Sequence, residues 1–344
     1  MGKVERDEDG TIAALKQVAA QFAVAVTPHL QAQIDPADPN DPIARQFLPD
    51  AAELVTLPHE REDPIGDDAH SPVAGIVHRY PDRVLLKLVN VCPVYCRFCF
   101  RREMVGPGSK GLSADQLDAA IDYIAQHPAI WEVILTGGDP LIVSPRRLKE
   151  VIARLNAIPH LGVIRIHSRV PVVDPARISD AMIDALQSSD KAVWLLLHAN
   201  HAREFVPEAV AAIRKLVKAG VPMLGQSVLL KGVNDSPAVL TYLFRAMVAN
   251  RIKPHYLHHG DLARGTSHFR LSLAEGQALM RRLRGHTSGL LQPTYILDIP
   301  GGHGKVPVGP GYAEPNDDGS WTVTDPWGCA HSYADPAYDD PATR

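Results

Sequence analysis

Three of the four cysteines lie within eight residues, at Cys92, Cys96 and Cys99. Thiolates with this C-x3-C-x2-C spacing share one compact loop and can converge on a single metal centre. A zinc ion would need a fourth protein ligand, whereas a four-iron cluster held by three thiolates keeps one iron open for a substrate or cofactor. Buried structural cysteines are a third interpretation. Because no second pair of cysteines is present to complete a zinc site, the spacing favours an iron–sulfur cluster.

Two glycine-rich segments carry other residues that could do chemistry. Lys305 ends the segment GGHGK, and Asp139 ends the triplet Gly137-Gly138-Asp139. Glycines let a backbone approach a ligand closely. Taken alone, however, a lysine after glycines is usually a solvated loop residue and a Gly-Gly pair is usually a turn. The function of both segments therefore depends on the elements that hold them.

The pattern of apolar residues predicts those elements. From about residue 84, short apolar runs rich in β-branched residues alternate with amphipathic stretches. We predict strands at 84–89, 133–135, 163–166, 193–197, 224–229 and 254–257, and a last apolar stretch at 294–297. Helices are predicted near 177–187, 207–219, 236–249 and 272–284, after two that begin at Ser113 and Ser144.

Several of these helices begin at recognisable N-caps. Ser113 is followed three residues later by Gln116, which is the arrangement of a capping box. Ser144 and Ser236 each precede a proline, which favours the first helical position. Gly220 suits the residue just past a helix end. These signals fix where the connections between strands and helices lie.

About six strand–helix units in succession predict a parallel sheet with right-handed crossovers. The sheet could be an open doubly wound sheet or a barrel. In either architecture, sites form where the strands end. Polar residues gather at these ends, namely His167-Ser168-Arg169, His198, Gln226, Asp261 and Asp298. We therefore expect the functional site at this edge.

Composition excludes several classes of protein. The chain has 344 residues and a formal net charge of -4, so nothing indicates a surface for nucleic acid. No run of 18 apolar residues is present, so no membrane span is expected. The charged N-terminus, MGKVERDEDG, lacks the apolar core of a signal peptide. We expect a cytoplasmic protein.

The cysteine loop resembles the signature of the radical S-adenosylmethionine (SAM) enzymes, in which this spacing follows the first barrel strand. The resemblance implies a [4Fe-4S] cluster on the three cysteines, at which SAM is cleaved to a 5′-deoxyadenosyl radical. The segment LTGGDP resembles the superfamily's GGE-type motif, with Asp139 in place of the commoner Glu. By the same resemblance, residues on the SAM side are Gly137, Gly138, Asp139, Ser168, His198 and Gln226.

A closer resemblance extends over residues 41–308. The segments HRYPDRVLL, CRFCFRR, LTGGDPL, SRVPVV, GQSVLLKGVND, RGHTSG and PGGHGKVPV are similar to lysine 2,3-aminomutase. Enzymes of this family combine the cluster and SAM with pyridoxal 5′-phosphate (PLP), and they move an amino group from C2 to C3 of an amino acid. The imine and pyridine ring of PLP can spread the unpaired spin that this migration requires.

The resemblance assigns further residues to PLP. Lys305 matches the lysine that holds the cofactor, although His303 departs from the usual PGGGGK segment. Arg79, Tyr80 and Arg83 match residues that contact PLP, and two guanidiniums can hold a phosphate by paired hydrogen bonds. On the motif alone, these arginines could equally form a surface cluster of ion pairs.

Three residues are implied in substrate binding. Arg101 matches the residue that clamps the substrate α-carboxylate, and Asp261 and Asp298 match two carboxylates that bind the distant ammonium. Two anions facing one cation favour a substrate with a cationic side chain, such as lysine. Taken singly, either Asp could instead be a helix cap or a loop anchor.

The implied fold is a partial (β/α)6 TIM-like barrel of the radical SAM type, in the α/β class. We expect residues 1–75 to form an N-terminal wrapping segment with a helix at 11–26, and residues 76–300 to form the barrel. Residues 301–344 would hold the PLP-lysine loop and a short C-terminal tail packed on the body. The tail has only Cys329 and His331, too few ligands for the structural zinc of longer family members.

The sequence therefore predicts an isomerase that interconverts L-lysine and β-lysine. A shorter branch of the family makes β-lysine for modification of elongation factor P, and the chain length resembles that branch, whereas the residues around Cys92 resemble the free-lysine enzymes. Two further hypotheses stay open, namely an aminomutase for another cationic amino acid and an inactive cofactor-binding sensor. The expected partners are L-lysine and a reducing electron donor, and a homo-oligomer stays open as well.

Overall fold

The computed structural model describes residues 8–109 and 111–334. Its main element is a nine-stranded sheet in which the strands follow one another in chain order. Strands β2 to β8 are parallel, while β1 and β9 pair antiparallel at the two edges. The bounds are β1 (Ile76–Tyr80), β2 (Arg83–Val89), β3 (Glu132–Gly137), β4 (Val163–Ser168), β5 (Ala192–His198), β6 (Met223–Val228), β7 (Ile252–His258), β8 (Thr294–Ile299) and β9 (Gly304–Pro307).

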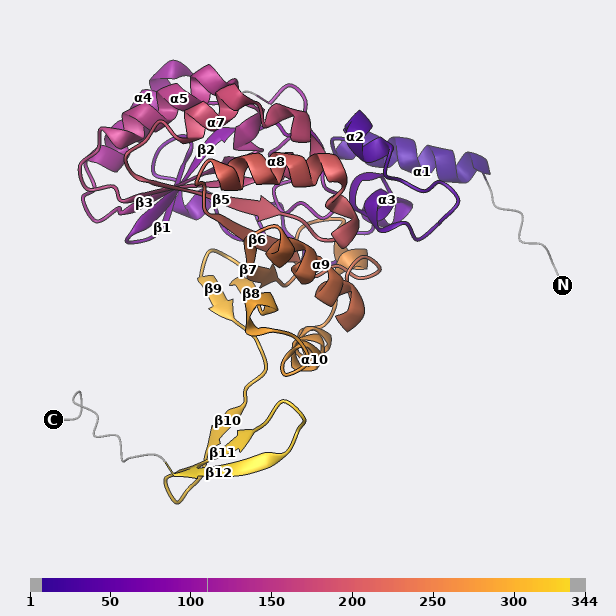
Figure 1. Ribbon diagram of the computed structural model, residues 1–344. Coiled ribbons are helices and arrows are strands. Elements are labelled where there is room, and N and C mark those ends of the chain that lie inside the picture. Colours follow the sequence, from indigo (N-terminus) through magenta and orange to yellow (C-terminus); the bar gives the residue numbers. More distant parts are fainter. Residues whose placement is uncertain (1–7, 110, 335–344) are drawn as a thin grey trace.

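Helices connect the consecutive parallel strands and cover the outer face of the sheet (Figure 1). They are α4 (Ala114–Ala125), α5 (Pro145–Asn156), α7 (Asp180–Leu186), α8 (Pro207–Lys218), α9 (Pro237–Ala249) and α10 (Leu273–Leu283), with the short α6 (Val170–Val173) just after β4. The expected α/β class and partial barrel are therefore confirmed.

The local signals in the sequence explain where these helices begin and which face they bury. Ser113 and Gln116 form the capping box of α4, and the Ser144 and Ser236 side chains cap α5 and α9. Gly220 follows α8 with a φ of 79°, which suits a glycine. The apolar stripes of α4 and α5 are buried, with Leu117, Ala120, Ile121, Ile124, Leu148, Val151, Ile152 and Leu155 inside.

The two edge strands bring distant parts of the chain together. Neither β1 nor β9 was predicted, because each is short and lies beside a turn or a glycine-rich segment. β9 extends the sheet past residue 300, where we expected the barrel to end. The Tyr80 hydroxyl of β1 accepts a hydrogen bond from the backbone N–H of Lys305 in β9, at 2.7 Å. This contact links the two edges of the sheet.

The N-terminal segment crosses the body instead of forming a separate core. It contains α1 (Glu8–Gln21), α2 (Pro28–Gln31), α3 (Pro42–Phe47) and the 3-10 turns η1 (Ala51–Leu54) and η2 (Asp68–His70). Leu30, Ile43 and Phe47 are fully buried in the main hydrophobic core. The Thr27 hydroxyl donates to the carbonyl of Val173, 146 residues away, at 2.5 Å. These contacts attach the N-terminal segment to the barrel.

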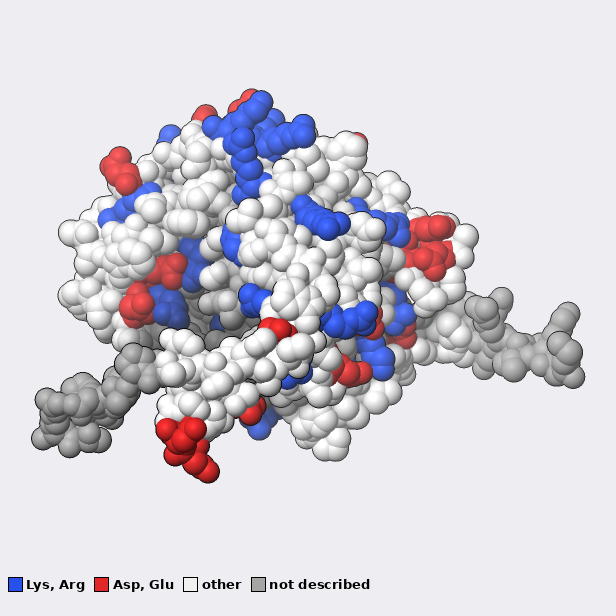
Figure 2. Space-filling model, turned by 60° about the horizontal axis from the view of Figure 1, so that its bottom comes forward, with Lys and Arg blue, Asp and Glu red and all other residues white. Residues whose placement is uncertain are grey.

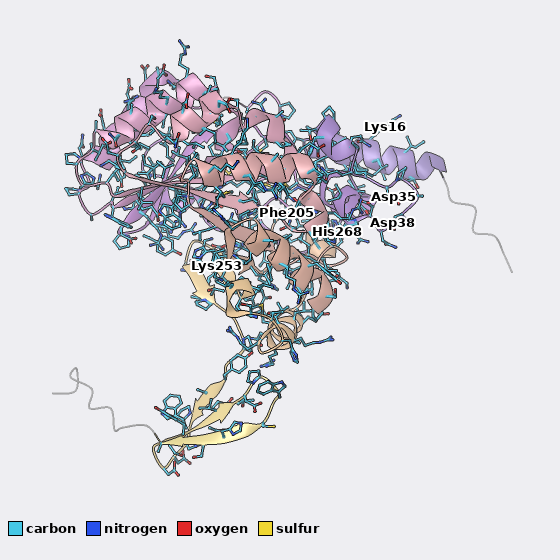
Figure 3. All side chains as sticks on the ribbon, viewed as in Figure 1. Lys16, Asp35, Asp38, Phe205, Lys253 and His268 are labelled. Carbon is cyan, nitrogen blue, oxygen red and sulfur yellow. The ribbon has the colours of Figure 1, made fainter. Side chains whose placement is uncertain are left out.

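The C-terminal region forms regular strands where its turn-rich sequence predicted a tail. Strands β10 (Ala313–Pro315), β11 (Ser320–Thr324) and β12 (Ala330–Ala334) form a small antiparallel sheet. Figure 1 shows this sheet below the barrel, and Figure 3 shows its side chains as sticks. Its loop reaches the body at Pro326, which lies beside Gly285 after α10. Trp321, Val323 and Tyr333 favour strands and lie together on this sheet. The turns between these residues led us to expect an irregular tail.

No helix among the described residues is both long and apolar enough to cross a membrane. The face shown in Figure 2 is mostly formed by other residues, and acidic and basic side chains are scattered over it in small groups. This mixture agrees with the small net charge of the chain and offers no continuous basic surface on that side.

Candidate active site

The cysteine loop follows β2 and lies under the N-terminal segment. Cys92, Cys96 and Cys99 line one pocket together with Phe22 and Ala23 from the end of α1. The loop is compact because the N–H of Cys99 donates to the carbonyl of Cys96, at 3.1 Å. All three sulfurs are therefore available to one bound group.

The environment of the thiols suits a strongly binding metal centre. Burial raises the pKa of Cys92 and that of Cys99, the latter to about 11, and the neighbouring cysteine charges add to both shifts. Thiolates kept this close need a cationic centre to hold them deprotonated. In the described residues, no three His, Cys, Asp or Glu side chains already form a ligand set for a metal ion. The fit of a cluster thus rests on the shared pocket and the donor chemistry.

Buried ion pairs hold the N-terminal segment over this loop. The Glu53 carboxylate of η1 accepts hydrogen bonds from Arg97, which lies between two of the cysteines, and from Arg102 just beyond them. Arg97 also donates to the carbonyl of Ala23, at 2.8 Å. A buried carboxylate shared by two guanidiniums is strongly destabilised if one partner is lost. The N-terminal segment is therefore fixed in place over the cysteine loop.

The glycine pair after β3 packs against the start of the cysteine loop. The N–H of Gly138 donates to Val89 at 2.5 Å, and that of Asp139 donates to Val91 at 3.0 Å. A Cβ on Gly138 would collide with the Val91 carbonyl oxygen. Glycine is required here because the two backbones touch.

The side chain of Asp139 is committed within the protein. Its carboxylate accepts hydrogen bonds from the Ser168 hydroxyl at 2.8 Å and from the Arg169 N–H at 2.7 Å. It also caps the turn at Leu141, at 3.0 Å. Burial raises the pKa of Asp139 despite these bonds. Asp139 and Ser168 therefore join the ends of β3 and β4.

Two further predicted SAM-side residues lie on the next strand ends. His198 ends β5, and its register partner Gln226 lies on the neighbouring β6. Burial holds the pKa of His198 well below its usual range, and the charge of Arg169 lowers it further. His198 is thus a neutral, half-buried side chain within reach of the charges of Arg169 and His258.

Lys305 and Asp298 form the centre of a second group of predicted residues. The ammonium of Lys305 donates to both carboxylate oxygens of Asp298. Burial pushes the pKa of Asp298 up, but the hydrogen bond from His258 and the charge of Lys305 outweigh it and lower the pKa to about 2. His258 Nδ1 lies 3.6 Å from the Asp298 carboxylate.

Asp261 adds a carboxyl group of a different character to this group. It is the second predicted ammonium ligand, and its Oδ1 is buried with no hydrogen-bond partner among the described residues. Burial and the nearby Asp298 charge raise its pKa to about 7. Asp298 is thus already paired with Lys305, whereas Asp261 gains or loses its proton within the physiological pH range.

The two arginines at the other side of the site share one carboxylate. Asp67 accepts Arg101 at 2.9 and 3.1 Å on one oxygen and Arg79 at 3.3 Å on the other. Arg101 also donates to the Thr136 hydroxyl at 3.2 Å. Burial would raise the pKa of Asp67, but the charge of Arg101 outweighs it and the pKa is lowered. The structure thereby links the predicted cofactor side to the predicted substrate clamp.

Arg83 is not brought together with Arg79. Its guanidinium pairs with the exposed Asp82 at 2.7 Å and stacks on the Tyr80 ring at 3.8 Å from the ring centroid. Arg79 and Arg83 therefore have different ion-pair partners, Asp67 and Asp82. Tyr80 is nevertheless in contact with both Arg83 and the Lys305 backbone.

Three residues of the site were not assigned from the sequence. Asp67 lies in an Asp-rich and Pro-rich stretch that resembles a solvated loop. His258 is the last residue of β7, three residues before Asp261, and Arg169 follows β4. For Arg169 and His258, the position at a strand end was the sequence signal that could have assigned them to the site. The sequence holds no such signal for Asp67, because Asp67 reaches the site only through the fold of the N-terminal segment.

Comparison with known proteins agrees with this arrangement. The Radical SAM superfamily matches residues 86–244, and the family described as Lysine-2,3-aminomutase matches residues 280–338. Among solved structures, a radical SAM methyltransferase from Sphaerobacter thermophilus is similar at a TM-score of 0.46 and 21% identity, over 64% of this chain and 68% of that one. The superfamily implies a [4Fe-4S] cluster and SAM.

Curated relatives cover most of the chain. L-lysine 2,3-aminomutase of Clostridium subterminale is 43% identical, over 90% of this chain and 73% of the relative. L-lysine 2,3-aminomutase of Escherichia coli (strain K12) is 36% identical, over 88% of each chain. Glutamate 2,3-aminomutase of Clostridioides difficile is 37% identical, over 87% of this chain and 70% of the relative. This chain therefore belongs to the lysine 2,3-aminomutase family of radical SAM isomerases.

Proposed function

We propose that the protein is a PLP-dependent aminomutase that interconverts L-lysine and β-lysine by moving the amino group between C2 and C3. The observation that carries this proposal is the group formed by Lys305, Asp298 and Asp261. It combines one lysine able to hold a carbonyl cofactor with two carboxyl groups able to hold an ammonium. Relatives with both lysine and glutamate in their names leave the substrate open, and the two carboxyl groups favour the cation.

The residues fit the three expected cofactors, which are the iron–sulfur cluster, SAM and PLP. Cys92, Cys96 and Cys99 would hold the cluster, the GGD segment and the ends of β4 to β6 would hold SAM, and Lys305 with Tyr80 and Arg79 would hold PLP. When bound, the cluster and SAM supply a radical that removes a hydrogen atom, and PLP supplies a conjugated ring that spreads unpaired spin.

Arg101 would bind the α-carboxylate of the substrate. Its guanidinium is fixed by Asp67 and Thr136, so its donors are oriented before a ligand arrives. A planar, pre-oriented guanidinium suits a carboxylate better than a flexible lysine ammonium would. Asp67 keeps this charge in place while it reduces the positive potential around it.

Asp298 and Asp261 would bind the distant ammonium. In the structure Asp298 is neutralised by Lys305, so it becomes available only when the Lys305 amine no longer carries a proton. His258 Nδ1 lies 3.6 Å from the Asp298 carboxylate and would stay beside it when Lys305 leaves. Commitment of Lys305 to the cofactor would thus free a carboxylate for the substrate.

Contacts at the edges of the sheet cover part of this site, while the Lys305 side chain is 34% exposed. Tyr80 joins β1 to β9, and the His70 ring bonds the Gly302 carbonyl at 3.1 Å, so the N-terminal segment covers the glycine-rich loop. A dry pocket protects a radical from unwanted reactions and strengthens the charge interactions inside it.

An anaerobic assay tests the proposal. The protein is reconstituted with iron and sulfide, mixed with SAM, PLP, a chemical reductant and L-lysine, and β-lysine is measured by mass-resolved chromatography. Accumulation of β-lysine supports the proposal, and competition by ornithine and arginine tests the preferred length of the cationic side chain. Deoxyadenosine without β-lysine would show a different substrate. Neither product from protein that holds cluster and PLP would favour a cofactor-binding sensor.

A further inference from the structure

A buried arginine contacts one of the three cysteines. Arg169 is the first residue after β4, and its Nη1 donates a hydrogen bond to the Cys96 sulfur at 3.2 Å. The side chain is only 6% exposed, so water does not screen this interaction. A guanidinium in such a place is costly to bury unless its partners fix it.

Those partners come from two other parts of the chain. Arg169 Nη2 donates to Glu204 at 2.8 Å and to the Gln46 side chain at 2.5 Å. Glu204 is itself saturated, because its other oxygen accepts the backbone N–H groups of Asn200 and His201. The guanidinium also lies over the Phe47 ring, at 4.6 Å from the centroid. Arg169 is therefore held in one orientation, with Nη1 directed at sulfur.

The sulfurs of Cys92 and Cys99 lie near neutral peptide groups instead. The backbone N–H groups of Asp139 and Arg101 oppose the rise in the pKa of Cys92 and of Cys99, respectively. Among the described residues, Cys96 is thus the cysteine of this loop whose sulfur bond comes from a charged side chain.

We propose that Arg169 is a positioning residue that raises the reduction potential of the cluster through Cys96. Reduction adds one electron to the cluster and makes its sulfurs more negative. A cationic donor at one sulfur stabilises that reduced form more than the oxidised form, because hydrogen bonds and net charge both set the potential. This inference rests on the proposed ligand role of the three cysteines.

A redox titration of the reconstituted cluster tests this inference. The midpoint potential is measured anaerobically by electron paramagnetic resonance, with Ti(III) citrate as the one-electron reductant and without SAM, so that SAM binding does not contribute. R169Q removes the charge and shortens the side chain, while R169K keeps the charge. R165Q is the matched control, because Arg165 lies on the same strand in a partly buried ion pair with Glu132.

We expect R169Q to make reduction less favourable by about tenfold, a downward shift of about 59 mV for one electron. R169K should recover part of the shift, and R165Q should leave the potential unchanged. If R169Q loads too little iron, the double variant R169Q/E204Q removes the buried charge pair together. It should show a smaller downward shift in the same direction, because the hydrogen bond to sulfur is lost but the Glu204 charge is no longer left unpaired. An unchanged potential in a loaded Arg169 variant would overturn the inference. A wild-type protein that holds no cluster would instead overturn the ligand role of the cysteines.

Discussion

Lys305 and Asp298 are register partners across the β8–β9 hairpin, and their side chains form an ion pair. The glycine-rich loop between the strands sets this register, since it brings the chain back antiparallel after four residues. The proposed cofactor lysine and a proposed substrate carboxylate thus neutralise each other in the unloaded protein. Each becomes available when the other gains a new partner.

Lys305 is the residue whose loss should affect activity most. We expect K305A to lower turnover of L-lysine by about 10³-fold or more, the scale seen when a covalent catalyst is removed. Borohydride treatment of the wild-type protein with PLP should attach the cofactor mass to the peptide that contains Lys305. K215A, in an exposed ion pair with Asp180, is the control. Attachment at another lysine would contradict the assignment.

Asp261 should make stability depend on pH in a defined direction. Burial raises its folded pKa to about 7 from 3.8, so the folded chain holds this proton more tightly than the unfolded chain. The contribution of Asp261 to the free energy of unfolding is therefore full below about pH 4 and is lost as the pH rises towards about 7. We expect D261N to gain about 2 kcal/mol in unfolding free energy, relative to wild type, between about pH 5 and about pH 8.5.

Thermal or denaturant unfolding across that pH range measures the effect. D184N, on the exposed face of α7, is the control and should follow the wild-type pH profile. An equal gain for D261N at both ends of the range would show that Asp261 stays ionised throughout.

Arg101 should determine affinity for the substrate carboxylate. R101K keeps the charge but loses the planar pair of donors, so we expect the KM for L-lysine to rise about tenfold or more. Inhibition by 1,5-diaminopentane, which has both amines and no carboxylate, should change little. R147K, in an exposed pair with Glu150, is the control. Equal losses for lysine and the diamine would indicate a general disturbance of the site.

Gly138 should be needed for the cysteine loop to form. In G138A the new Cβ would meet the Val91 carbonyl, so the strand end or the loop must move, at a cost of about 1 to 3 kcal/mol. We expect a lower melting temperature and less iron per chain after reconstitution. G289A adds a methyl group in open space and should keep both values. Full iron loading in G138A would show that the loop tolerates the shift.

The parts of the fold that follow from local signals were predictable. Strand β5 and helix α8 lie within two residues of the predicted ranges, and α4 begins next to the predicted Ser113 cap. Buried β-branched runs and serine or proline at a helix start are local features, so they can be recognised in the sequence. The edge strands β1 and β9 were missed, since each depends on a neighbour that is distant or on a turn. The sheet β10–β12 was missed for the same reason, because pairing across turns is not visible in one short segment.

The candidate site also contains residues that the sequence could predict and residues that it could not. The cysteines, Lys305, Asp261 and Asp298 were identifiable from spacing and strand-end position together with the family resemblance. Their partners were not. Asp67 joins Arg79 to Arg101, and this relationship exists only because the N-terminal segment folds back across the barrel. Arg83 pairs with the adjacent Asp82, which is the kind of surface ion pair that the sequence motif left open as an alternative.

The nine strands of the main sheet stand side by side in the order of synthesis. As the chain leaves the ribosome, each new strand can therefore join an edge that is already present, and no strand must wait for a later one to be inserted between neighbours. The last strand to arrive is β9, and it carries Lys305. A truncated or stalled chain would hold the cysteine loop but no lysine for the cofactor, so the chain gains its second reactive centre only when the whole sheet has been made.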